Sequence, residues 1–99
     1  MANYREQKVT NEIKRLLGSI ISREVRDPSV PSMCSIISIK VTKDLKHAKV
    51  DVSFLEKDID IEKAISALNR ASGFLRHRLG DEMSTRTVPE LKFVYNKSI

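Results

Sequence analysis

Residues 61–80, IEKAISALNRASGFLRHRLG, decide how this 99-residue chain folds. Their apolar side chains recur at the three- and four-residue spacing of a helix with one buried face: Ile61, Ala64, Ile65, Leu68, Ala71, Leu75 and Leu79. Phe74 would point away from that face if the helix were straight. We therefore predict a break or kink at Ala71-Ser72-Gly73, which would let Phe74 and Leu75 both reach the core. The alternative is a straight helix with an exposed phenylalanine.

Polar residues and a glycine set the expected ends of this helical segment. Asp58 or Asp60 can cap its start, because a side-chain carboxylate accepts hydrogen bonds from the unpaired amides of a first helical turn. Gly80 can end the segment, although residues 81–83 could extend it by one turn.

Two runs of alternating polarity precede this segment and predict an antiparallel hairpin. Residues 37–42 and 49–54 each alternate apolar with polar side chains, and the polar link Asp44-Leu45-Lys46-His47 separates them. One face of the hairpin should therefore lie on the core. Its predicted core residues are Ile37, Ile39, Val41, Val50, Val52 and Phe54. A last strand is predicted after Pro89, with Leu91, Phe93 and Tyr95 facing the core.

The chain begins with the most regular helical pattern. Residues 4–26 carry apolar side chains at helical spacing, and Asp27-Pro28 should stop the helix because a residue before proline avoids the helical region. The expected order is α-β-β-α-kink-α-β, within one domain that spans residues 1–99. A strand-helix-strand crossover lays its helix on the sheet, so both helices should cover one face of a three-stranded sheet. This is an α+β fold.

Composition indicates a globular domain with an anionic partner. Hydrophobic residues make up 40% of the chain and charged residues 31%, and no run approaches the roughly 18 apolar residues that a membrane span needs. The first residues lack the apolar run of a secretory signal, so we expect a cytoplasmic protein. Eighteen Lys and Arg against 13 Asp and Glu give a net charge of +5, which favours a nucleic acid or a membrane surface as the partner.

No residue pattern predicts catalysis, a metal site or a cofactor. Cys34 is the only cysteine, which excludes a disulfide within the chain and a multi-thiolate metal site. It lies beside an apolar run, where buried cysteines are common, so we do not expect a nucleophile. His47 and His77 lack the spacing of a metal-binding motif, and we interpret both as surface residues.

Basic residues gather in three groups. The first group lies on the first helix, opposite its apolar face: Lys8, Arg15 and Arg26. The second surrounds the predicted kink and continues just beyond it: Arg70, Arg76, Arg78 and Arg86. The third crowds the hairpin turn: Lys43, Lys46 and Lys49. Such groups are often no more than solvated faces, but three of them on a small domain of net charge +5 indicate nucleic acid. Because Phe54, Phe93 and Tyr95 are assigned to the core, binding should depend on backbone charge and RNA shape more than on stacking.

Four blocks of the sequence resemble the ribosome-binding factor A family. They are YREQKVTNEIKRLLGSIISREVRDPSV (4–30), SIKVTKDLKHAKVDVSFL (38–55), ALNRASGFLRHRLG (67–80) and RTVPELKFVYNKSI (86–99). In the third block an Ala-x-Gly step, Ala71-Ser72-Gly73, stands where other KH domains carry a Gly-x-x-Gly loop. Blocks in this order cover nearly the whole chain and are far more specific than any single motif.

The resemblance implies a type II KH-like fold and a non-catalytic, cytoplasmic protein that associates with the free small (30S) ribosomal subunit. It also implies a role in late maturation and processing of precursor 16S rRNA, important in the cold. Gly73 lacks a Cβ, which permits close backbone approach and unusual dihedrals. The missing second glycine departs from the KH pattern, so a backbone clamp on phosphates is not supported. Members of the family often continue past the last strand with a tail, whereas this sequence ends at Ile99.

Two functions of different classes follow. The first is direct binding of 16S rRNA on the small subunit by a monomer that binds no membrane. The second is a protein-interaction module that docks on ribosomal proteins or an assembly GTPase without recognising RNA. An enzyme that uses Cys34 or a histidine is a third, much weaker hypothesis. The residues predicted to contact RNA are Lys8, Arg15, Arg26, Lys43, Lys46, Arg70, Ala71, Ser72, Gly73, Arg76, Arg78 and Arg86.

Overall fold

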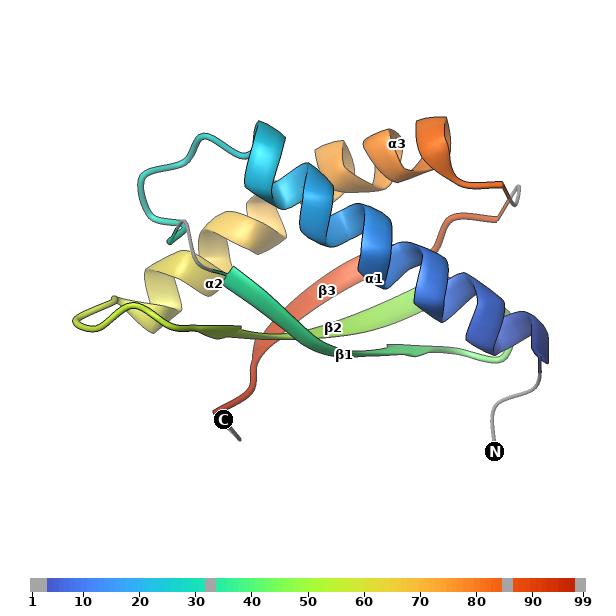
Figure 1. Ribbon diagram of the computed structural model, residues 1–99, viewed down its shortest axis with the longest axis horizontal. Helices are drawn as coiled ribbons and strands as arrows, with labels where there is room; N and C mark the ends of the chain where they lie inside the picture. The colour runs from blue at the N-terminus through green and yellow to red at the C-terminus, as the bar shows by residue number, and fades with distance from the viewer. Residues whose placement is uncertain (1–3, 32–33, 85–86, 98–99) are drawn as a thin grey trace.

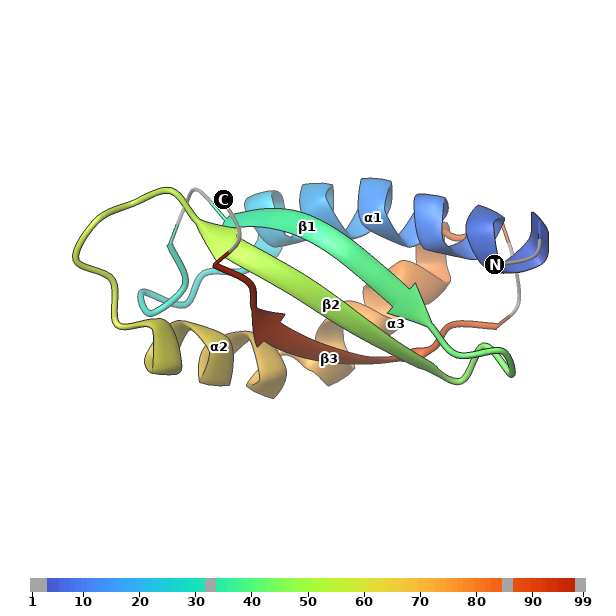
Figure 2. The same cartoon turned by 90° about the horizontal axis from the view of Figure 1, so that it is seen from below.

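A layer of helices covers one face of a three-stranded sheet in the computed structural model, which describes residues 4–31, 34–84 and 87–97 (Figure 1). The elements are α1 (Tyr4–Glu24), β1 (Cys34–Val41), β2 (His47–Phe54), α2 (Ile61–Arg70), α3 (Ser72–Glu82) and β3 (Glu90–Tyr95). β2 is the central strand, antiparallel to β1 and parallel to β3. Figure 2 shows the other face of the sheet, which no helix covers. The predicted α+β fold, with both helical segments on one face, is confirmed.

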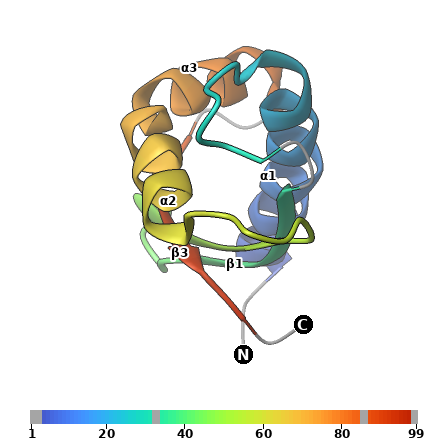
Figure 3. The same cartoon turned by 90° about the vertical axis from the view of Figure 1, so that its left-hand side faces the viewer.

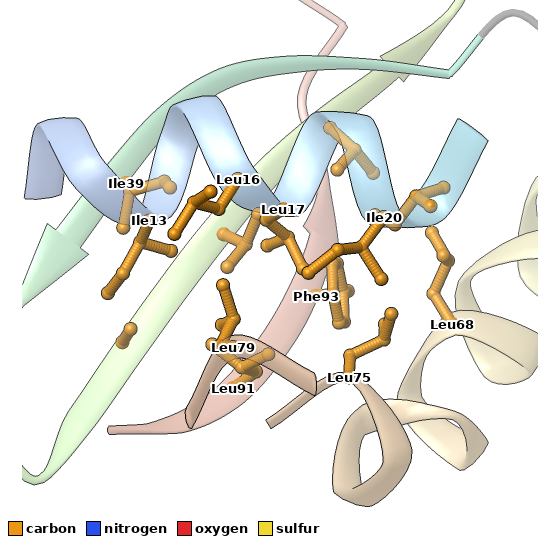
Figure 4. Close-up of a cluster of buried hydrophobic side chains, with 14 of the residues drawn as sticks. Ile13, Leu16, Leu17, Ile20, Ile39, Leu68, Leu75, Leu79, Leu91 and Phe93 are labelled. Atoms are coloured by element: carbon orange, nitrogen blue, oxygen red, sulfur yellow. The ribbon is translucent and has the colours of Figure 1, made fainter. Parts of the chain in front are cut away.

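The apolar face of α1 supplies a large part of the core. Its buried residues are Val9, Ile13, Leu16, Leu17, Ile20 and Ile21. They face Leu68 of α2, Leu75 and Leu79 of α3, and Phe93 of β3 across the space between the helices and the sheet (Figure 4). The helical spacing of apolar residues in 4–26 therefore identified this packing surface correctly, and the helix itself ends at Glu24.

A β-bulge in β1 changes which side chains face the helices. Ile36 pairs with Val52 and Ser38 pairs with Asp51, so Ile37 is the extra residue. Ile36 packs against the core, whereas simple alternation had given that place to Ile37. The prediction for Ile37 was wrong because a bulge inserts one residue and shifts the alternation.

The predicted break between the two helices is confirmed at Ala71. The backbone amide of Ala71 donates to Ala67 O at 3.1 Å, and Leu75 N donates to Ala71 O at 2.9 Å, so hydrogen bonding passes directly from α2 into α3. Leu75 is completely buried, but Phe74 is 48% exposed. The prediction that Phe74 reaches the core was wrong, because adjacent residues point about 100° apart around a helix and Leu75 takes the inward position.

Side-chain hydrogen bonds fix both ends of α2. Asp60 Oδ1 accepts from Lys63 N at 3.1 Å, so Asp60 is the cap among the two aspartates considered. Asn69 Nδ2 donates to Phe93 O at 3.0 Å, and Asn69 Oδ1 accepts from Phe93 N at 2.8 Å. These two bonds satisfy outward-facing backbone groups of the edge strand β3 and fix the end of α2 beside it. α3 continues past Gly80 to Glu82, the longer of the two predicted ends.

Gly18, a half-buried residue within α1, provides a test of helix stability. A Cβ at this position would lie 3.9 Å from Ile36 Cδ1, an ordinary contact, and none of the described glycines has a positive φ. We expect Gly18→Ala to raise the free energy of unfolding by about 1 kcal/mol, because alanine is favoured over glycine in a helix interior. Urea denaturation should show a higher midpoint with an unchanged slope; a lower midpoint would contradict the helix packing described here.

Candidate nucleic-acid interface

The surface around the α2–α3 break is open to solvent. Arg70, Gly73, Phe74 and Arg76 are all exposed, and the side chain of Arg70 is 67% exposed. Arg76 Nε donates to Val88 O at 3.1 Å, while the two terminal nitrogens of its guanidinium make no hydrogen bond within the described part of the chain. Two arginines and an aromatic ring therefore lie close in sequence to a residue that carries no side chain, with Arg70 turned to Asp27 after α1 and Arg76 turned to Val88 before β3.

Gly73 has a simpler role than the one predicted for it. Its φ is not positive, so the expectation of unusual dihedrals at this residue was wrong. A Cβ placed on Gly73 would have no atom within 4 Å, so the residue is not required by packing inside the protein. What glycine provides here is a bare backbone at the surface in the first turn of α3, which leaves room for close approach by a ligand.

Arg70 also connects the break to the end of α1. Its Nη2 lies 3.6 Å from Asp27 Oδ2, and Asp27 Oδ1 accepts from Ser29 N at 2.9 Å. The segment 25–31 consequently runs between the end of α1 and α2 (Figure 3). Arg26, the exposed neighbour of Asp27, lines a pocket with Ser22 of α1 and Cys34 of β1 and does not contact the break.

Arg78 is held in an ion-pair network between helices. Its Nε and Nη2 donate to the two oxygens of Glu24 at 2.7 and 2.8 Å, Nη1 donates to Asp81 at 3.0 Å, and Nη2 also donates to Glu82 at 2.9 Å. These carboxylates, Glu24 first, raise the pKa of Arg78. A forked pair of this kind fixes the end of α1 against α3, and it occupies the donors that a phosphate would need.

The Glu24–Arg78 pair should make the stability of the protein depend on acid pH. The hydrogen bonds from Arg78 lower the pKa of Glu24 from its ordinary value of 4.5. A lowered pKa means that the pair contributes fully above pH 4.5 and loses its contribution as the pH falls through the folded-state pKa. We therefore expect the stability difference between the wild type and Glu24→Gln to be largest at neutral pH. It should shrink below pH 4.5 in urea unfolding; a difference independent of pH would contradict the pairing.

The other predicted RNA contacts lie elsewhere on the molecule. Lys8 and Arg15 are exposed on α1, and Lys43 and Lys46 are exposed at the hairpin turn. The hairpin turn and the start of α1 share one end of the molecule (Figures 1 and 2). Ala71 and Ser72 are half-buried within the break itself. Arg86 lies outside the described residues.

The hairpin turn that carries Lys43 and Lys46 has a defined geometry. Asp44 Oδ1 accepts from Thr42 Oγ1 at 2.6 Å and from Lys46 N at 3.0 Å, and these bonds lower the pKa of Asp44. Leu45 has a positive φ of 62° yet is only 4% exposed. Burial of its side chain offsets the steric cost of a left-handed backbone at a residue with a branched side chain.

Three further cations, of which two had not been singled out, align across the sheet. Lys40 pairs with Lys49 in the β1–β2 register, and Lys49 pairs with Lys92 in the β2–β3 register. All three are exposed. Periodicity could place Lys40 and Lys92 on outward faces of their strands, but only the register between strands shows that they form a row.

Groups with catalytic potential show no activating environment. Cys34 is half-buried, and burial raises the pKa of its thiol to about 11, so the thiol is protonated at neutral pH. His47 and His77 are exposed, and His47 Nδ1 lies 3.6 Å from Glu90 Oε2. Across the described residues, His, Cys, Asp and Glu side chains nowhere gather in threes around a possible metal position. None of the described helices has the length and apolar character to cross a membrane.

Comparisons with known sequences agree with the resemblance of the four blocks. A profile of the ribosome-binding factor A family matches residues 5–99. The whole chain is 42% identical to ribosome-binding factor A from Clostridium beijerinckii, of which it covers 85%. It is 41% identical to the protein of the same name from Chloroflexus aurantiacus, of which it covers 78%.

Solved structures are similar in fold as well as in sequence. The crystal structure of ribosome-binding factor A from Thermus thermophilus superimposes with a TM-score of 0.77 at 25% identity, over 93% of this chain and 97% of that one. A homology model of the T. thermophilus protein, fitted into the cryo-EM map of a complex of the 30S subunit with ribosome-binding factor A, gives a TM-score of 0.70 at 26% identity, over 86% and 88% of the two chains. With the family profile covering residues 5–99 and the fold shared throughout, the chain belongs to the ribosome-binding factor A family.

Proposed function

We propose that this protein binds the free small (30S) ribosomal subunit and contacts its 16S rRNA with the surface around the α2–α3 break. Arg70, Gly73, Phe74 and Arg76 carry the proposal, because their joint exposure around one bare stretch of backbone is what a phosphate-and-base ligand requires. The 30S complex of the T. thermophilus protein supports the choice of partner. Lys8 and Arg15 add exposed positive charge on α1, and Arg26 adds one just past its end, all away from the break.

Phe74 adds a contribution that charge alone would not give. Its ring is 48% exposed beside Gly73, so a splayed base could stack on it. Stacking of a base on an aromatic side chain contributes about 1–3 kcal/mol and tolerates any base. The expectation that too few aromatics remain for stacking is therefore revised at this one position. Arg78 is left out of the proposed surface because three carboxylates already bind it.

In this proposal the protein has no catalytic step. It acts as a cytoplasmic monomer that binds the immature subunit during late maturation and processing of precursor 16S rRNA, with particular importance in the cold. The half-buried Cys34 thiol is protonated at neutral pH, which supports the view that it is not a nucleophile.

Co-sedimentation with purified small subunits at several salt concentrations tests the proposal. If several phosphates are bound, the logarithm of the affinity should fall linearly with the logarithm of the salt concentration, by about 0.7–0.9 per phosphate contact. Deproteinised 16S rRNA should compete for the protein. Binding to subunits that is independent of salt, with no competition by the rRNA, would indicate docking on a ribosomal protein and would overturn the proposal.

A further inference from the structure

The face of the sheet that lies away from the helices carries a row of three like charges. Ala48, Val50 and Val52 of β2 face the core, so Lys49 lies on the opposite face together with its register partners Lys40 and Lys92. Neighbouring strands are about 4.8 Å apart, which places the three Cα atoms within roughly 10 Å of one another. Like charges directly opposite each other on adjacent strands disfavour folding.

No carboxylate in the described chain forms an ion pair with this lysine row. Two acidic groups lie on the same face and offset part of its charge: Glu90 is 3.6 Å from His47 Nδ1, and Asp51 accepts from Ser38 Oγ at 2.7 Å. None of the three ammonium groups has an ion-pair partner among residues 4–31, 34–84 and 87–97. The contrast with the helical face is clear, since Arg70 and Arg78 both contact carboxylates there.

A shallow groove of about 450 Å³ follows the row across the sheet. It lies between the lysine row and a second row across the strands, Thr42, His47 and Glu90, with Val41, Ala48 and Leu91 between the two rows. Lys43 and Lys46, both exposed, lie in the hairpin turn and continue the positive charge beyond the groove. An extended polyanion lying along the row would therefore meet three ammonium groups in succession, with Lys43 and Lys46 beyond the ends of β1 and β2.

We propose that Lys40, Lys49 and Lys92 form a second binding surface, which takes the phosphate backbone of an rRNA segment on the face of the domain opposite the α2–α3 break. Lysine ammonium groups on flexible stems suit phosphates as point charges. Phe54 and Phe93 pack into the core and Tyr95 stacks on Phe54 with ring centroids 5.9 Å apart, so none of these three rings lines the groove. Recognition there depends on backbone charge and not on base identity. The inference rests on the proposed binding to the small subunit and places the domain between two RNA segments.

The test compares two triple variants with the same change in charge. Lys40, Lys49 and Lys92 are changed to glutamine in one, and the exposed Lys14, Lys57 and Lys97, which lie outside the row, in the other. We expect the row variant to bind small subunits at least about tenfold more weakly than the control in 0.1 M salt. The slope of log affinity against log salt concentration should also be less steep by about 2 than that of the control. Its melting temperature should equal or exceed that of the wild type, because like-charge repulsion has been removed.

Each other outcome has a defined meaning. If the wild type binds subunits and the two variants bind equally well, the second surface is wrong while the proposed function stands. If the row variant loses affinity for subunits but keeps full affinity for deproteinised 16S rRNA, the partner on this face is a protein and the inference is overturned. A wild type that fails to bind subunits at all would reject the proposed function itself.

Chemical acetylation of the unmodified protein gives a measurement that needs no variant. Bound to small subunits, Lys40, Lys49 and Lys92 should be acetylated several-fold more slowly than in the free protein, as read by mass spectrometry. The exposed Lys14 and Lys57 should react at the same rate in both states. Equal reactivity of the row in the two states would overturn the inference.

Discussion

Changing Arg70 and Arg76 together to glutamate should weaken binding to the small subunit by about a hundredfold. Both guanidinium groups are exposed beside the α2–α3 break, and a charged hydrogen bond to phosphate contributes about 1.5–3 kcal/mol, of which the lower end is roughly tenfold in affinity for each residue. Reversal adds repulsion to the loss of contact. The fold should persist, because neither side chain is buried and the core does not involve them. Co-sedimentation with subunits and circular dichroism of the free variant measure the two properties separately.

A control with the same change in charge separates local contact from overall electrostatics. Lys14→Glu with Lys57→Glu alters two exposed cations away from the break and lowers the net charge by the same amount. We expect it to reduce the affinity by less than about tenfold, because exposed charges beyond a Debye length are largely screened. Equal losses in the two double variants would show that only the net charge matters and would remove Arg70 and Arg76 from the site.

Replacing Phe93 with alanine should destabilise the protein more than any other single change considered. Its side chain is 1% exposed in the core between α1, the α2–α3 pair and the sheet (Figure 4). Truncating a buried phenylalanine costs about 3–5 kcal/mol, a large part of the 5–15 kcal/mol that a small domain has in total. For a domain of this size, the melting temperature should fall by about 15 °C or more.

Phe74→Ala is the matched control, since it removes the same ring from an exposed position. We expect the free energy of unfolding to change by no more than about 0.5 kcal/mol, as for other surface substitutions, while binding to small subunits weakens by about tenfold. The two phenylalanines thus separate stability from binding. A loss of stability in Phe74→Ala comparable to that in Phe93→Ala would return Phe74 to the core and contradict the geometry at the break.

Local patterns in the sequence predicted helices and strands well in segments where the spacing of apolar residues follows one regular period. The spacing in residues 4–26 identified the buried face of α1, and the misfit of Phe74 identified the break at Ala71. The same reasoning failed at Ile37, because a bulge shifts the phase of a strand pattern, and at the burial of Phe74, because Leu75 takes the inward position beside it. The bulge is not encoded in the spacing of apolar residues.

The candidate site was harder to predict from the sequence than the fold, because it depends on contacts between segments that are far apart along the chain. Arg78 looked equivalent to Arg76 along the chain, yet it binds Glu24, which is 54 residues away. Asn69 carried no signal, although its side chain fixes α2 to β3. The lysine row emerges only once the parallel register of β2 and β3 is known. Counting cations in sequence identifies a basic protein, and only the tertiary structure separates ion-paired cations from those available to a ligand.

The most direct test of the account attaches an iron chelate to a cysteine at residue 77, in a His77→Cys, Cys34→Ala protein, and maps cleavage of 16S rRNA by the hydroxyl radicals it releases. His77 is exposed on α3 next to Arg76, so its replacement should leave the fold and the contacts at the break intact. The account predicts strong cleavage at a short, contiguous stretch of 16S rRNA when the protein is bound to small subunits. Bound protein that produces no cleavage from residue 77 would contradict the claim that the α2–α3 break faces the RNA.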